Sequence, residues 1–371
     1  MEIIKETTPH LRKKQSVTSM MCDVLIALAP TLVFAFVIYP LETLYFLLIS
    51  LAVMIGCEFI YIGLRNMYPK DGEKRSFKEK FIHAYKGTFT VNNILTPAIS
   101  AVIFTLIMPA GAPLYAVFIG SFVGIVFGKL VFGGLGNNIF NPACVGMIFA
   151  KLCFGSQYQT YVPTWYYSMN DVTASATPLG LINSYNLVNY NEYSMFNLFF
   201  GQIPGTLGEV YKITILIGLA YLLIRRAIDW RIVVSYFGTF TVLILIVGST
   251  MLARVPNFEV FKFVGYSLFS GGLLFGGTFM LTDPVTSPID APSRVFYGCI
   301  AGILTVFIRI FAGLPEGVGF SILLVNMLAP LLDYPSWSSQ KFTKKKVIVI
   351  CSILVLAMLA CFLIIYFKEG L

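Results

Sequence analysis

Residues 23–39 read DVLIALAPTLVFAFVIY and residues 43–64 read TLYFLLISLAVMIGCEFIYIGL. A helix needs about 20 predominantly apolar residues to cross a bilayer, and both stretches are close to that length. Comparable runs follow along the chain. The sequence therefore predicts eleven spans, at 23–39, 43–64, 91–108, 114–132, 140–155, 210–224, 232–252, 263–281, 295–312, 317–333 and 347–367. The short runs at 140–155 and 317–333 are the candidates for broken or re-entrant elements.

The composition of the chain supports the same conclusion. Of its 371 residues 57% are hydrophobic and 12% are charged, whereas soluble domains are about 25% charged. This excludes a soluble enzyme, a disordered chain and a secreted disulfide scaffold. The seven cysteines and two histidines have no zinc or iron–sulfur spacing, so no metal site is expected. We predict an all-α polytopic membrane protein that contacts lipid and does not bind nucleic acid.

The basic residues, which give a net charge of +8, follow the predicted spans. Cytoplasmic loops of membrane proteins are rich in Lys and Arg. If residues 1–22 form a cytoplasmic segment, 19 of the 26 basic residues fall on the cytoplasmic side. Residues 152–211 contain no Lys or Arg, and this topology places most of them outside. A loop at about 156–209 is too long for a simple connector and is expected to carry function.

The spans suggest an internal division. A membrane domain at 23–335 holds about ten core helices in two five-helix halves, and residues 336–371 add a basic linker and a further C-terminal helix. Each half contains glycines followed by polar residues and proline, at Gly133–Ala143 and at Phe275–Pro288. Five spans per half would make the halves antiparallel, as in inverted repeats. The charge pattern instead places both motifs on the cytoplasmic side, and the sequence leaves this conflict open.

The first motif has the residue types of a polar site within a membrane. Glycine allows close backbone approach, while Asn138 and Asn141 each offer donors and acceptors. A run of this kind favours a broken backbone that lines a polar site, and a tight interhelical turn is the alternative. Charges inside spans are costly and are functional candidates. Glu58 lies mid-span, should face the protein interior and is a candidate for an ion pathway, whereas Lys129 and Arg309 could snorkel to the boundary.

The outside loop contains Asp171–Leu179, which reads DVTASATPL. Composition alone gives a small-residue turn, and an ordinary loop is the plain alternative. The small neighbours leave the hydroxyl of Thr177 accessible as an acceptor for covalent modification.

This motif resembles the recognition sequence of a flavin transferase, which joins FMN through its phosphate to a threonine. Around it, the chain resembles the RnfD subunit of the Rnf-type electron transport complex and, more distantly, the NqrB subunit of the sodium-translocating NADH:quinone reductase. The resemblance covers most of residues 9–335. It rests on separated motifs in the right order, at Pro9-His10, Met21, Asp23–Pro30, Lys129–Ala143, Gly201–Glu209, Phe279–Pro288, Arg309, Pro315–Gly317, Asn326 and Pro330–Asp333. The chain departs from the family at Ala174-Ser175, where Ser or Thr followed by Gly is more frequent.

The resemblance implies a covalent flavin. Thr177 would carry FMN by a phosphoester bond, and Asp171, Ser175 and Ala176 would belong to the same recognition sequence. The implied complex passes electrons between reduced ferredoxin and NAD, couples this to movement of Na⁺ or H⁺, and lies in the bacterial or archaeal inner membrane. The chain has no glycine fingerprint for NAD and no cysteine framework for iron–sulfur clusters. It is therefore expected to be one relay, with an outside flavoprotein subunit and iron–sulfur subunits as partners.

A second, noncovalent flavin such as riboflavin is also implied. Its candidate residues are those at the two polar helix ends: Asn138, Asn141, Asp283 and Thr286. Two alternatives remain at this stage. One is a secondary transporter or channel that uses broken helices and carries no flavin, and the other is a purely structural membrane scaffold. Modification of Thr177 distinguishes both from the flavoprotein.

Overall fold

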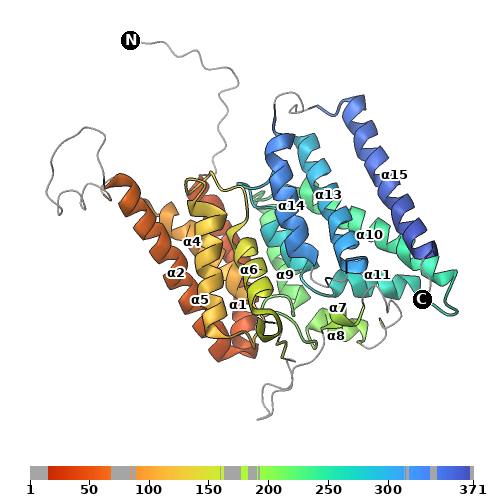
Figure 1. Ribbon diagram of the computed structural model, residues 1–371, viewed down its shortest axis with the longest axis horizontal. Coiled ribbons are helices and arrows are strands. Elements are labelled where there is room, and N and C mark those ends of the chain that lie inside the picture. Colours follow the sequence, from red (N-terminus) through yellow and green to blue (C-terminus); the bar gives the residue numbers. More distant parts are fainter. Residues whose placement is uncertain are drawn as a thin grey trace.

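The computed structural model describes residues 16–67, 85, 89–158, 160–162, 177–182, 190, 193–312, 314, 317–334 and 341–367. Over these residues the named elements are helices, and one isolated β-bridge joins Pro109 to Thr206. The helices stand side by side in a bundle, with the first half of the chain on one side and the second half on the other (Figure 1). The prediction of an all-α polytopic membrane protein is confirmed.

The first five predicted spans form one group of helices. These are α1 (Val17–Ile38), α2 (Pro40–Asn66), α4 (Asn92–Leu106), α5 (Leu114–Ile125), which continues into the π-helix η1 (Val126–Leu130), and α6 (Pro142–Tyr158). Within the group α2 packs on α4 and α5, α5 packs on α6, and α1 packs on α4. Ser16 caps α1, because its hydroxyl accepts the Ser19 N–H at 3.1 Å. The first helix therefore begins six residues before the predicted span.

The next five predicted spans form the second group. They are α9 (Lys212–Ile224), α10 (Trp230–Leu252), α11 (Val260–Phe269) with α12 (Leu273–Phe275) and the π-helix η3 (Gly276–Met280), α13 (Ala291–Ile310) and α14 (Gly317–Leu332). Here α10 packs on α13, and α13 packs on α14. The two groups meet where α9 lies along α1 and where α14 contacts α6.

The break in a membrane helix lies elsewhere than predicted. α14 is a continuous helix, and α6 departs from helical geometry at Gly155, close to its end. The eighth span is the broken one, since α11 and the α12–η3 segment meet at 61°. Gly271 adopts a φ of +61° at the break, a conformation that suits glycine because it has no Cβ. A broken helix is therefore not found at 317–333, whereas the kink of α6 at Gly155 lies at the end of 140–155, and a re-entrant course of either segment stays a prediction.

Helix length separates two kinds of span. α1, α2, α10, α13 and the C-terminal α15 (Lys344–Phe367) are long and apolar enough to cross a membrane, and the bent pair gives a sixth crossing. The other apolar helices have 10 to 17 residues and include α4, α6, α9 and α14. α15 packs against α10 and α13 and is the additional helix expected from the sequence. Two short helices, α7 (Pro178–Leu181) and α8 (Met195–Phe200), lie at one end of the bundle (Figure 1).

Candidate functional site

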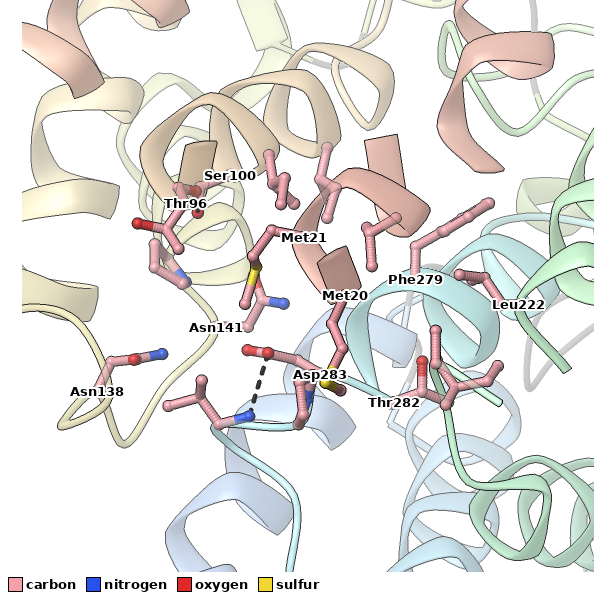
Figure 2. A pocket seen from close by; sticks show the side chains of 18 of the residues that line it. Met20, Met21, Thr96, Ser100, Asn138, Asn141, Leu222, Phe279, Thr282 and Asp283 are labelled. Carbon is pink, nitrogen blue, oxygen red and sulfur yellow. Dashed lines mark hydrogen bonds between the residues drawn. The ribbon is translucent and has the colours of Figure 1, made fainter. Parts of the chain in front are cut away.

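The two glycine-containing motifs meet at one cavity between the two groups of helices, called the central cavity here. Asn141 Nδ2 donates a hydrogen bond to the carbonyl oxygen of Met280 at 3.4 Å, which joins the start of α6 to the end of η3. The contact is expected if both motifs share one side, as the charge pattern predicts. The cavity beside it, of about 70 Å³, is lined by Asn138 and Asn141 from the first motif and by Asp283 from the second (Figure 2).

Asn141 has a structural task at this cavity. Its Oδ1 accepts the N–H groups of Ala143 at 3.0 Å and of Cys144 at 3.4 Å, so the side chain caps the N-terminus of α6. Asn138 makes fewer hydrogen bonds than Asn141. Its Nδ2 donates to the carbonyl oxygen of Phe140 at 3.3 Å, and its Oδ1 accepts no hydrogen bond from any residue that the structure describes.

Asp283 is held in a turn between η3 and α13. Its Oδ1 accepts the Val285 N–H at 3.3 Å, the contact drawn in Figure 2, and its Oδ2 accepts the Thr286 hydroxyl at 3.4 Å. Burial raises the pKa of the Asp283 carboxyl, while these hydrogen bonds and the charge of Lys129 act in the opposite direction. Thr286 thus supports Asp283 without lining the cavity.

A buried ion pair lies at the same cavity. Lys129 Nζ is 2.9 Å from Glu58 Oε2 and donates to the hydroxyl of Thr96 at 3.0 Å. The side chains of Lys129 and Glu58 are 3% and 2% exposed. Lys129 and Thr96 line the cavity, and Lys129 belongs to η1. The expectation that Lys129 snorkels to the boundary is wrong, because the carboxylate of Glu58 satisfies its charge inside the bundle.

The expectation for Arg309 is wrong for a similar reason. Arg309 is 3% exposed, and its Nη1 donates to the carbonyl oxygen of Ser267 at 3.1 Å. Its guanidinium also lies 5.5 Å from the centre of the Phe240 ring, within the range of a cation–π contact. The arginine is therefore held inside the second group of helices.

A larger cavity lies beside the central one. A second cavity of about 530 Å³ shares with it the lining residues Met20, Ala227, Ile228, Thr282 and Pro284. Pockets for small organic ligands have volumes of about 300–1,000 Å³, a range that the second cavity reaches and the central cavity does not. The wall of the second cavity includes Asp229, which accepts hydrogen bonds from Arg231 and Arg294.

The remaining predicted residues lie in the outside loop. Asp171, Ser175 and Ala176 are outside the described residues, and Thr177 is the first described residue after them. Thr177 caps α7, since its Oγ1 accepts the Gly180 N–H at 3.1 Å. The side chain is half-buried and lines a small cavity with Glu209, Lys212 and Gly271.

Sequence reasoning missed several residues of these sites. Lys212 stands beside a Gly-rich motif, and a lysine that enters an apolar run at such a motif is a signal for a buried partner. Thr96 and Met20 carry no such signal, because they are brought to the cavity by the packing of α1 and α4.

The chain matches the NQR2, RnfD, RnfE family over residues 4–343. It is 29% identical over 343 residues to the RnfD subunit of the Na⁺-translocating ferredoxin:NAD⁺ oxidoreductase complex of Acetobacterium woodii, a match that covers 92% of this chain and 93% of the relative. It is 30% identical over 341 residues to the RnfD subunit of the proton-translocating ferredoxin:NAD⁺ oxidoreductase complex of Clostridium ljungdahlii, covering 88% and 92%.

Similarity extends to a second type of complex. The chain is 34% identical over 237 residues to the NqrB subunit of the Na⁺-translocating NADH-quinone reductase of Chromohalobacter salexigens, covering 64% of this chain and 57% of the relative. The named relatives are subunits of redox-driven ion translocases and not complete enzymes. With a match over nearly its whole length, the chain belongs to the NQR2, RnfD, RnfE family.

Proposed function

We propose that this chain is the flavin-carrying membrane subunit of an Rnf-type ion-translocating oxidoreductase complex. In this role it relays electrons between ferredoxin and NAD half-reactions that other subunits carry out, coupled to movement of Na⁺ or H⁺. The support is the similarity to the two RnfD subunits over about nine tenths of each chain. The complex would lie in a bacterial or archaeal cell membrane with the N-terminus of this subunit in the cytoplasm. Its partners would include an outside flavoprotein subunit and iron–sulfur subunits.

The observation that carries the proposal is the bonding of Thr177. Its Oγ1 accepts one hydrogen bond from Gly180, and its hydroxyl proton is donated to no described residue. A transferase that forms an Oγ1–phosphorus bond breaks a phosphorus–oxygen bond of its flavin donor and releases that proton. No described hydrogen bond of the chain is lost, so Thr177 fits a phosphoester linkage.

The chemistry of the relay belongs to the cofactor, since bound FMN accepts and passes on electrons one or two at a time. The residues of this chain hold and orient it. Thr177 fixes one end at the start of α7, and Tyr266 ties α7 to α11 because its hydroxyl donates to the Pro178 carbonyl oxygen at 3.1 Å. The attachment point is thereby coupled to the helical bundle.

The proposal is tested by coexpressing the complex with an active flavin transferase and inspecting a denaturing gel under ultraviolet light. We expect a fluorescent band for this subunit that is absent in Thr177→Ala and kept in Thr164→Ala, a threonine of the same loop that lies outside the recognition stretch. An unaltered chain without fluorescence would overturn the flavin assignment and favour the transporter or channel. Full complex activity in Thr177→Ala would favour the structural scaffold.

We further propose that the central cavity and the larger second cavity beside it together hold a noncovalent flavin, of which riboflavin is the simplest form. The support is that Asn138, Asn141 and Asp283 come from two distant motifs and line one cavity. The free Oδ1 of Asn138 and the carboxylate of Asp283 are acceptors suited to the N–H of a flavin ring. Ring binding there would rest on this chain's amide and carboxylate groups and on the apolar contacts of Met20 and Phe279.

This second site is tested by the flavin that denaturation releases from the purified complex. We expect Asn138→Leu to lose the released flavin and to keep the fluorescent band at Thr177. The neighbouring Asn137→Leu is the control, because Asn137 is exposed and does not line the cavity. Equal release from both variants would exclude the cavity as the binding site.

A further inference from the structure

One wall of the central cavity carries a buried lysine. Lys129 belongs to the π-helix η1, is 3% exposed and lines this cavity, whereas its partner Glu58 does not line it. Single π-helical turns within α-helices occur frequently at functional sites. Because only the lysine lines the cavity, the positive charge of the pair is nearer to a bound molecule than the negative charge is.

The ammonium group of Lys129 keeps a donor for a further partner. A lysine has three N–H donors. Nζ of Lys129 donates to Thr96 Oγ1 at 3.0 Å and forms the ion pair with Glu58 Oε2 at 2.9 Å, and no other described residue accepts a hydrogen bond from it. A buried N–H is costly to leave without an acceptor. An acceptor atom of a molecule in the cavity is suited to this position.

The cavity also holds the acceptors that suit the N–H of a flavin ring. Asn138 and Asp283 line it together with Lys129, and the charges of Asp283 and Lys129 attract each other. The oxidised ring carries one N–H, in its pyrimidine portion, and the negative charge gained on reduction gathers in the same portion. A ring that directs this N–H to Asn138 or Asp283 therefore brings its charge-accepting portion toward Lys129.

We propose that Lys129 sets the reduction potential of the noncovalent flavin at the central cavity, with Glu58 moderating the effect of its charge. The inference rests on the proposed noncovalent flavin. A nearby positive charge stabilises the reduced ring more than the oxidised ring, because reduction adds negative charge. The effect is strong in the interior, where charges are screened less than in water. Glu58 opposes it only in part, because its carboxylate is the more distant charge.

The experiment measures the midpoint potential of the noncovalent flavin by redox titration of the purified complex, followed by visible absorption. The signal of this flavin is the difference from the complex with Asn138→Leu, which is expected to lack it. We expect the double variant Lys129→Met with Glu58→Gln to lower the potential, because the nearer, positive charge is lost. Lys129→Arg keeps that charge and should largely keep the potential of the unaltered protein.

Two further variants make the test specific to charge. Glu58→Gln alone should raise the potential, because the opposing charge is lost while Asp283 still provides a counter-charge for Lys129. Lys262→Gln should leave the potential unchanged, since this lysine of α11 is 34% exposed and pairs with Glu259. A lysine with only a structural role would not give shifts of opposite sign in the double variant and in Glu58→Gln.

The flavin content separates the possible failures. If the purified complex releases no noncovalent flavin, or if Asn138→Leu releases as much as the unaltered protein, the proposed site and the inference fall together. If Asn138→Leu loses flavin and the double variant does not lower the potential, the inference alone is overturned. Should the double variant fail to assemble or to retain flavin, Glu58→Gln decides, since a potential that is not raised contradicts the role of Lys129.

Discussion

The central cavity and the Thr177 region differ in how their polar groups are used. At the central cavity Asn141 caps α6 and bonds to η3, Asp283 closes a turn, and Lys129 is paired with Glu58. Beside Thr177 the lysine of the small cavity contacts backbone carbonyls, and the hydroxyl proton of Thr177 has no described acceptor. The polar residues of the first region are therefore used to stabilise the fold, whereas the hydroxyl of Thr177 is still available to form a phosphoester.

The largest expected effect is at the paired lysine of the central cavity. Lys129→Met leaves the carboxylate of Glu58 buried without its cation, and removing one partner of a buried pair costs about 3–5 kcal/mol. We expect a large loss of stability in thermal unfolding of the complex in detergent. The double variant Lys129→Met with Glu58→Gln should recover much of it, and a double variant no more stable than the single one would refute the pairing.

The next effect concerns the break of the eighth span beside Thr177. Gly272→Ala places a methyl group against the carboxylate of Glu209, the far end of a side chain that is 9% exposed and must shift, so it should destabilise by about 1 kcal/mol. The same change at Gly238 in α10 has no atom within 4 Å and is the matched control. There, alanine should be neutral or stabilise by up to about 1 kcal/mol, because it favours helix more than glycine does. Thermal unfolding of the two variants measures the difference, and equal stability would show that Glu209 does not pack on the break.

The smallest effect distinguishes a residue that stabilises the fold, Asn141, from a residue that is proposed to bind flavin, Asn138. Asn141→Ala removes the cap of α6 and should cost about 0.5–2 kcal/mol. Asn138→Ala loses a single bond to Phe140, so it should leave stability nearly unchanged while lowering the flavin released on denaturation. Thermal unfolding and flavin content of the two variants test this, and equal losses of stability would contradict the division of tasks.

The spans were predictable because lipid imposes long apolar runs, and every one of the eleven coincides with a helix or helix pair. The break in α11–α12 was not predictable, because glycines are frequent in continuous membrane helices and nothing local marks Gly271. The sequence singles out Asn138, Asn141 and Asp283, because polar side chains beside apolar membrane spans are costly to bury and stand out as candidates. Their meeting depends on how α6 packs near η3, which no local pattern encodes.

The charged residues show the same limit. Glu58 lies in the interior, as its position in the middle of a span predicts, but its partner comes from a different helix. Lys129 stands near the end of a predicted span, where snorkelling is the ordinary expectation, so only the structure identifies the pair. The ion-pathway role of Glu58 stays a prediction.

Attachment of FMN to Thr177 is tested most directly by mass spectrometry of the peptide that contains this residue. After coexpression with an active transferase, we predict a peptide heavier by FMN minus one water, with the added group located on Thr177 by fragmentation. The same peptide at its unmodified mass, in a complex that otherwise assembles, would show that Thr177 is not the flavin carrier.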